Sequence, residues 1–181
     1  MIFGTPKVAG VASAALLVAG LAVPGFAEDK QATIEDALGA APPALAETAT
    51  VMSMDGHVLR EGDGAYTCFP SDGLAGSMCL DAEWMRWADA WMNKKEFEPE
   101  QVGIAYMLAG DPPDGGASNT DPFATEETAD NQWVVEGPHL MLIGPGVTEG
   151  VTDDPETGQP YVMWKGTPYE HVMVPVAPRP E

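Results

Sequence analysis

The sequence predicts an α+β fold in which a small antiparallel sheet is covered by a Trp-rich helix and held by one disulfide. Three observations favour this fold. One segment repeats apolar residues at helical spacing, several others are runs of strand-forming residues between turns, and the chain has two cysteines. No long internal repeat divides the chain, so we expect one domain.

The first 27 residues have the pattern of a secretory signal peptide. Lys7 precedes an uncharged run over residues 8–26, and small residues at the −3 and −1 positions favour cleavage after Ala27. The alternative is a retained anchor helix, which is disfavoured because Ala, Gly and a Pro weaken the run as a membrane span. We therefore expect a periplasmic or secreted protein whose residues 28–181 form the single domain.

The chain is strongly acidic, with a net charge of −20 at pH 7. Cleavage would remove only one charged residue, Lys7, and leave −21. Binding to nucleic acid or to an anionic membrane requires a basic patch, so neither is expected as a partner. A solvated acidic surface is the simplest interpretation of such a charge.

Cys68 and Cys79 are the only cysteines. An even number in an exported chain predicts a disulfide. A redox site would favour the C-x-x-C spacing, and a zinc site would need four closely spaced ligands. Closing the loop between the two cysteines would stabilise the fold by about 2–3 kcal/mol.

A helix is predicted over residues 82–93, with Asp81 as its N-cap. One apolar stripe on this helix consists of Trp84, Trp87, Ala88 and Trp91. Such a stripe is expected to pack on the sheet, where its large aromatic side chains contribute most of the buried apolar area.

The remaining elements are shorter. Helices are predicted over 34–38 and 44–46, and strands over 51–60 (with a turn at Asp55-Gly56), 65–69, 103–109, 133–136, 139–143, 160–165 and 169–176. Two long acidic loops rich in Gly and Pro cover 109–132 and 144–159. Loops of this length in a compact domain are usually functional or disordered.

The 109–132 loop suggests two kinds of chemistry. Its oxygen ligands for calcium would be Asp111, Asp114, Asn119 and Asp121, although no EF-hand pattern is present. A hydrolase triad would combine Ser118 and Asp121 with His139 or His57, although no G-x-S-x-G motif is present.

Two strands carry the same His-x-Met pattern, at His139 and Met141 and at His171 and Met173. Residues at i and i+2 lie on one side of a strand, so each His is expected beside its Met, with the aliphatic residues between them facing the core. A three-residue loop over 166–168 would place Met163 opposite His171 and would keep this segregation of the two faces.

The His/Met face suggests a copper site, because thioether and imidazole ligands suit Cu(I). The pattern resembles ligand pairs of periplasmic copper-handling proteins. The candidate ligands are His139, Met141, Met163, His171 and Met173. The alternative is that Met fills the core and the three Trp side chains pack on the Met side of the sheet.

Several segments together resemble a group of exported bacterial proteins whose function is uncharacterised. They are LREGDGAYTCFP, MCLDAEWMRWADAWMN, GIAYML, ASNTDPF, PHLMLIGP and PYVMWKGTPYEHVMVPV. The resemblance implies a single exported domain and supplies no catalytic residue.

These observations predict an exported acidic binding or interaction protein. The most specific version of this hypothesis is that the protein binds copper through the His/Met face. Two alternatives stay open: a secreted enzyme of hydrolase type that uses the 109–132 loop, and a structural or partner-binding domain without chemistry of its own.

Overall fold

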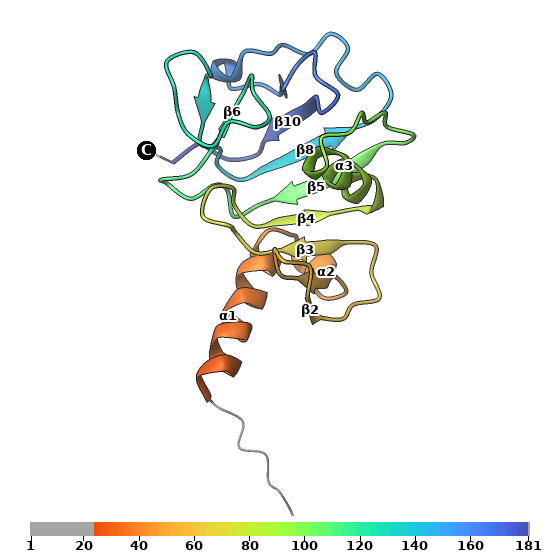
Figure 1. The fold of residues 1–181 in the computed structure, drawn as a ribbon, viewed down its shortest axis with the longest axis vertical. Coiled ribbons are helices and arrows are strands. Elements are labelled where there is room, and N and C mark those ends of the chain that lie inside the picture. The colour runs from red at the N-terminus through yellow and green to blue at the C-terminus, as the bar shows by residue number, and fades with distance from the viewer. Residues whose placement is uncertain (1–23, 181) are drawn as a thin grey trace, which may run out of the picture.

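The structure, a computed structural model, describes residues 24–180 (Figure 1). Most of the predicted signal segment therefore lies outside the described residues, and the predicted cut before Glu28 falls within the first helix, α1 (Pro24–Gly39). None of the helices in the described part is long and apolar enough to cross a membrane.

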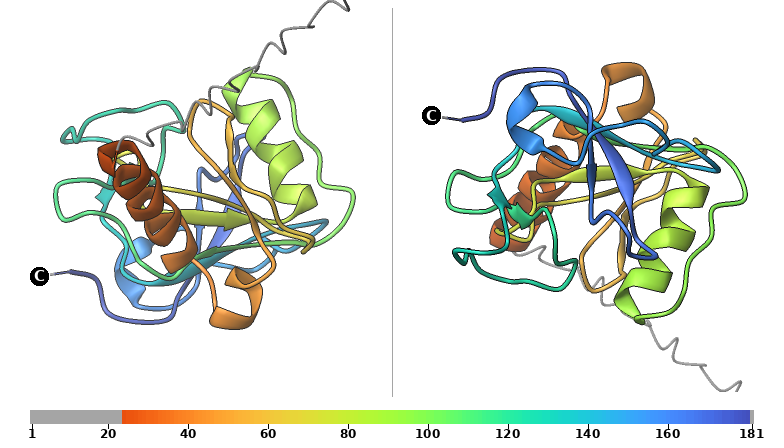
Figure 2. Two further views of the ribbon diagram at one scale, coloured as in Figure 1. Left: turned by 90° about the horizontal axis from the view of Figure 1, so that it is seen from below. Right: turned by 90° about the horizontal axis from the view of Figure 1, so that it is seen from above.

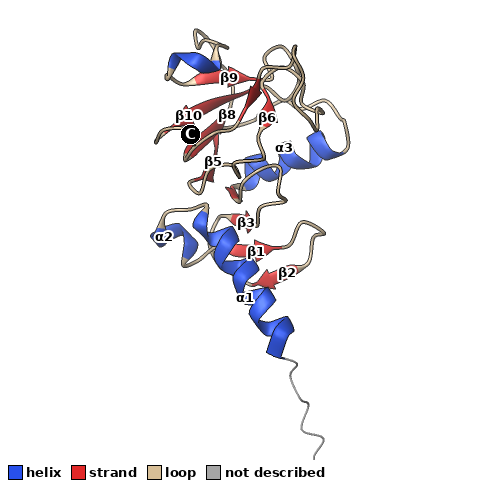
Figure 3. Ribbon diagram, turned by 90° about the vertical axis from the view of Figure 1, so that its left-hand side faces the viewer, coloured by secondary structure: helices blue, strands red, loops and turns tan. Residues whose placement is uncertain are grey.

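The main sheet has eight strands and is larger than predicted. In sheet order they are β2 (Val58–Arg60), β1 (Thr50–Met52), β3 (Thr67–Phe69), β4 (Met78–Leu80), β5 (Gly103–Met107), β8 (His139–Ile143), β10 (His171–Pro175) and β9 (Tyr161–Met163). The sheet is mixed rather than purely antiparallel, because β1 and β3 run parallel. Figure 3 shows the strands in succession from β2, near α1, to β9.

Two strands form a separate small sheet, β6 (Ala117–Ser118) with β7 (Trp133–Val134). The strand β6 lies within the loop predicted over 109–132, so that segment is not wholly irregular. The second long loop contains a 3-10 helix, η1 (Pro155–Thr157). The predicted turn at Asp55-Gly56 joins β1 to β2, and the short helix α2 (Pro43–Ala46) lies where a helix was expected.

Helices cover both faces of the sheet (Figure 2). The Trp-rich helix α3 (Ala82–Met92) packs on one face, against a buried cluster that includes Leu80, Ala105 and Met141. The other face, at Val51, Cys68 and Cys79, packs against α1. Side chains alternate between the faces of a strand, so neighbouring residues such as Cys79 and Leu80 belong to different cores.

The start of α3 follows the prediction. Asp81 Oδ1 accepts a hydrogen bond of 2.9 Å from the Trp84 backbone N–H, as expected of an N-cap. Trp84 and Trp87 are buried, whereas Trp91 is half-buried. Ala90 is buried in place of the half-buried Ala88, so the stripe faces the sheet at a slightly different angle from the one predicted.

The predicted disulfide joins Cys68 to Cys79. The two residues lie directly opposite each other on β3 and β4, and both are fully buried. They contact the α1 side of the sheet, where Cys79 Sγ lies 3.7 Å from the Ala37 carbonyl oxygen. The disulfide therefore stabilises the core beneath α1, and it is connected to α3 only through the chain that continues from β4.

One expectation about the faces is wrong. The aliphatic side of β8 was expected to face the core, but Leu140 and Leu142 are half-buried, whereas His139, Met141 and Ile143 are buried. The reason is the position of α3, which brings its Trp side chains onto the His/Met side of the sheet. The Trp side chains of α3 thus pack on the Met side of the sheet, as the alternative interpretation predicted.

Candidate functional site

The final hairpin has the predicted register. His171 lies opposite Met163, and Met173 lies opposite Tyr161. On its other side, Met173 pairs with Met141 of β8. Directly opposed residues have Cβ atoms about 4.5–5.5 Å apart. The sheet therefore gathers one imidazole and three thioethers in a single patch on the α3 side.

His139 does not join this patch. It lies opposite Pro175, and His171 is four residues away along β10, which is roughly 13 Å in a strand. Side chains that stand parallel on a sheet cannot share one ion across that distance. The other four predicted ligands occupy directly paired or i, i+2 positions on β8, β10 and β9, with Met163 opposite His171 and Met141 opposite Met173.

Aromatic rings enclose His171. Its ring lies 5.4 Å from that of Trp84, 5.6 Å from that of Trp87 and 5.1 Å from that of Trp164, measured between centroids. All three contacts are edge-to-face. Trp87 and Trp164 stack with each other at 5.6 Å, so the imidazole sits against a block of parallel indoles in a dry, apolar setting.

Trp164 is held in a left-handed backbone conformation, with φ of 56°. A bulky residue avoids this region unless its surroundings impose it. Here the backbone N–H of Trp164 bonds to the Asn119 carbonyl oxygen at 2.8 Å, and its indole Nε1–H donates to the Ser118 carbonyl oxygen at 2.7 Å. The β6 segment therefore fixes the indole that faces His171.

The hydrogen bonding of His171 defines its tautomer. Its Nδ1 lies 3.0 Å from the Tyr169 carbonyl oxygen, which can only accept, so Nδ1 carries the proton and Nε2 keeps a lone pair. Burial lowers the pKa of His171 to about 4, which keeps the ring neutral at physiological pH. A neutral imidazole anchored through Nδ1–H to a carbonyl is the usual state of a metal-binding histidine.

The candidate calcium ligands do not form a cluster. Among residues 24–180, no group of three or more His, Cys, Asp or Glu side chains is arranged to hold a metal ion. Asp111 instead accepts from the backbone N–H groups of Gly76 and Glu136, and Asp121 accepts from that of Phe123. Burial raises the pKa of Asp111.

The candidate triad residues also make structural contacts. Ser118 Oγ donates to the Asn131 carbonyl oxygen at 2.9 Å and accepts from the backbone N–H groups of Thr120 and Asp121. His57 is exposed on the β1–β2 hairpin, beside Asp55. These bonds hold the turns of the loop, and Ser118 Oγ is directed to backbone groups rather than to a histidine.

Sequence reasoning missed a buried carboxylate, Glu136, which is 1% exposed. Its Oε1 accepts from Tyr161 Oη at 3.0 Å and from Arg179 Nε at 3.0 Å and Nη2 at 2.7 Å. Burial, together with the nearby Glu136 charge, raises the pKa of Tyr161. The sequence does contain a signal for this buried carboxylate: an acidic residue ends the apolar run Trp133-Val-Val-Glu136.

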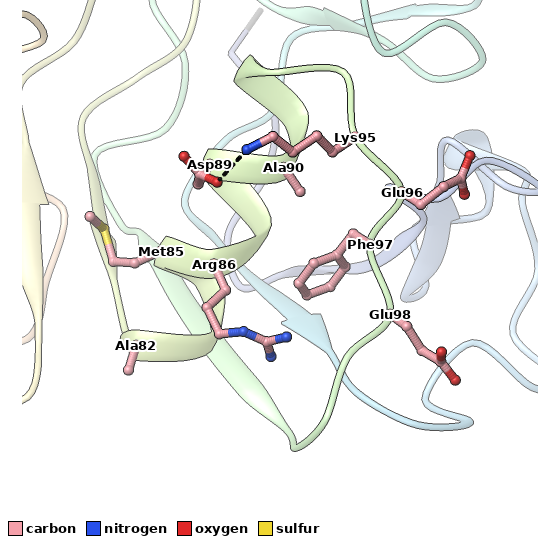
Figure 4. Close-up of a pocket in the computed structure, with 9 residues that line it drawn as sticks. All are labelled: Ala82, Met85, Arg86, Asp89, Ala90, Lys95, Glu96, Phe97 and Glu98. Atoms are coloured by element: carbon pink, nitrogen blue, oxygen red, sulfur yellow. Dashed lines mark hydrogen bonds and ion pairs between the residues drawn. The ribbon is translucent and has the colours of Figure 1, made fainter.

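A hollow of about 510 Å³ lies between α3 and the segment that follows it (Figure 4). Arg86 and Phe97 line it, with the guanidinium 5.6 Å from the ring centroid. Arg86 also forms ion pairs with Glu83 at 2.7 Å and Glu100 at 2.9 Å. Arg86, the cation beside Phe97, is thus already paired with two carboxylates, and the other charged side chains that line the hollow are Asp89, Lys95, Glu96 and Glu98.

Comparison with protein-family models, curated proteins and solved structures found no match to this chain.

Proposed function

We propose that this chain is an exported acidic binding protein that holds Cu(I) at the His171 patch, defined as His171, Met163, Met173 and Met141. The observation that carries the proposal is the tautomer of His171, which keeps a lone pair on Nε2, together with the methionines at the neighbouring positions of the sheet. Imidazole nitrogen and thioether sulfur are ligands that select Cu(I) over harder ions.

The surroundings of the patch support the same ion. The stacked indoles exclude water, and a monovalent soft cation loses less solvation there than a divalent hard one would. The strongly negative chain would also raise the local concentration of cations.

The test is a competition titration of residues 28–181 with Cu(I) against a chromogenic chelator under anaerobic conditions. Met163→Leu combined with Met173→Leu removes two sulfur atoms at nearly constant volume. We expect tight one-to-one binding by the wild type and a loss of at least about tenfold in affinity in the double variant.

His139→Ala is the matched control, because His139 is buried in the same face but distant from the patch. It should bind Cu(I) as the wild type does. Equal binding by the wild type and the double Met variant, or no binding by either, would reduce the patch to core packing.

A further inference from the structure

Arg179 occupies a site built for a guanidinium group at the end of the sheet. Its Nε and Nη2 donate to Glu136 Oε1, its Nη1 donates to Glu156 Oε1 at 2.9 Å, and Nη2 also donates to the Pro155 carbonyl oxygen at 2.7 Å. Glu136 is almost fully buried, whereas the side chain of Arg179 is 30% exposed. The main acceptor, Glu136, is therefore part of the core, whereas Arg179 and Glu156, whose side chain is 78% exposed, lie at the surface.

Arg179 satisfies only one of the two carboxylate oxygens of Glu136. Both donors that reach Glu136 converge on Oε1, which Tyr161 also uses. The second oxygen, Oε2, is buried and has no hydrogen-bond partner among the described residues. A carboxylate and a guanidinium are most stable as a two-oxygen fork, and a buried carboxylate oxygen without a donor is costly. Arg179 thus leaves unused the acceptor that a freely oriented guanidinium could engage.

The space beside Arg179 could hold the body of such a ligand. A cavity of about 480 Å³ is lined by Glu136, Pro155, Glu156, Gly158, Pro175, Val176, Ala177, Pro178 and Arg179. Small apolar residues, among them Pro175, Val176 and Ala177, form the part of its walls beside the charged groups, which suits a short alkyl chain attached to a cation. Residues 176–180, which follow β10, belong to no helix or strand, and the Val176 and Ala177 N–H groups both bond to the Pro138 carbonyl oxygen.

We infer that this pocket is a guanidinium-binding site, which the chain's own Arg179 fills and from which an arginine side chain or a small alkylguanidinium displaces it. Glu136 supplies both carboxylate oxygens to the incoming group, Glu156 holds its outer edge, and the cavity receives its alkyl chain. The inference is independent of copper, because it uses none of the residues of the His171 patch.

The experiment follows the backbone amides of Gly137 and Gly158 and the Nε–H signal of Arg179 by NMR, on residues 28–181. Ethylguanidinium in millimolar excess should shift the Arg179 signal toward that of free arginine. In Arg179→Ala the internal competitor is absent, so ethylguanidinium should bind about tenfold or more tightly than to the wild type. Butylammonium, which has the charge but no planar fork, should bind the variant at least about tenfold more weakly than ethylguanidinium.

Arg60→Ala is the control, since Arg60 also donates to backbone carbonyl oxygens, those of Ala46 and Ala49. It should bind ethylguanidinium as the wild type does. An acetylated and amidated Gly-Arg-Gly peptide distinguishes the sources: binding by the peptide indicates a partner's arginine, and binding by ethylguanidinium alone indicates a small molecule.

The inference is overturned if Arg179→Ala binds ethylguanidinium no better than the wild type, or no better than it binds butylammonium. If this variant fails to fold, recovery of its fold by ethylguanidinium but not by butylammonium supports the site. Absence of that recovery rejects it.

Discussion

At the scale of single residues, the informative positions are polar side chains that the fold has buried. His171 and Glu136 are 2% and 1% exposed, and each would be costly to bury without partners. His171 satisfies one nitrogen through the Tyr169 carbonyl oxygen, and Glu136 satisfies one oxygen through Tyr161 and Arg179. In both side chains one atom is left with unused bonding capacity, and both proposals start from that atom.

The buried imidazole predicts a pH dependence of stability. The folded-state pKa of His171 is about 4, below its ordinary value of 6.5, so the unfolded chain binds a proton that the folded chain does not. The free energy of unfolding should therefore fall as the pH decreases below 6.5, with a contribution of about 2 kcal/mol between pH 7 and pH 5. Urea denaturation of His171→Leu at both values should show a pH dependence that is smaller by this amount.

Comparison of variant with wild type cancels the contributions of other groups, such as Asp111, whose raised pKa acts in the opposite direction. An unchanged pH dependence in His171→Leu would mean that folding does not lower the pKa of His171.

At the scale of elements, one side chain connects helix and sheet. Asp81 Oδ1 caps α3 at Trp84, and its Oδ2 accepts from the Ile104 backbone N–H of β5 at 2.7 Å. The same carboxylate therefore sets where the helix begins and how it lies over the strand. This placement brings Trp84 and Trp87 onto His171.

Asp81→Ala should destabilise the chain by about 2–3 kcal/mol, because it removes an N-cap and leaves the Ile104 N–H without its acceptor. The measurement is the urea midpoint, followed by Trp fluorescence. Asp89→Ala, at an exposed position of the same helix, should change stability by less than about 0.5 kcal/mol. Similar losses in the two variants would show that Asp81 acts only through its charge.

At the scale of the whole molecule, the sheet separates two cores and the surface carries a large negative charge. Four of the eight basic residues form ion pairs with carboxylates among the described residues: Arg86, Lys95, Lys165 and Arg179. Most carboxylates therefore have no cationic neighbour, and their mutual repulsion opposes the compact state.

Salt should stabilise the molecule by screening that repulsion. We expect the midpoint of thermal unfolding to rise when NaCl is increased from 10 to 500 mM, by about 2–4 °C for each kcal/mol gained. The rise should shrink at pH 4, where part of the carboxylates is protonated. A midpoint that is constant or falls with salt at pH 7 would show that surface repulsion is not significant.

Local patterns predicted the elements that depend on neighbouring residues. The N-cap at Asp81, the turn at Asp55-Gly56 and the register that pairs Met163 with His171 are of this kind. The strands β4 and β6 were missed, because their two or three residues carry too little periodicity, whereas β7 lies within the strand predicted over 133–136. The relative position of the two His-x-Met pairs could not be predicted, since a shared pattern does not reveal that His139 lies opposite Pro175 rather than opposite His171.

The sequence by itself determined the acidic charge, the disulfide pair, the Trp-rich helix and the alternation that places His and Met on one side of their strands. Only the tertiary structure decided that this side is the buried one, and that His171 lies among three indoles while His139 lies apart. Only it brought Arg179 onto Glu136, 43 residues earlier in the chain. The physical reason is that periodicity specifies which side chains share a face, whereas the packing of helices and loops specifies what covers that face.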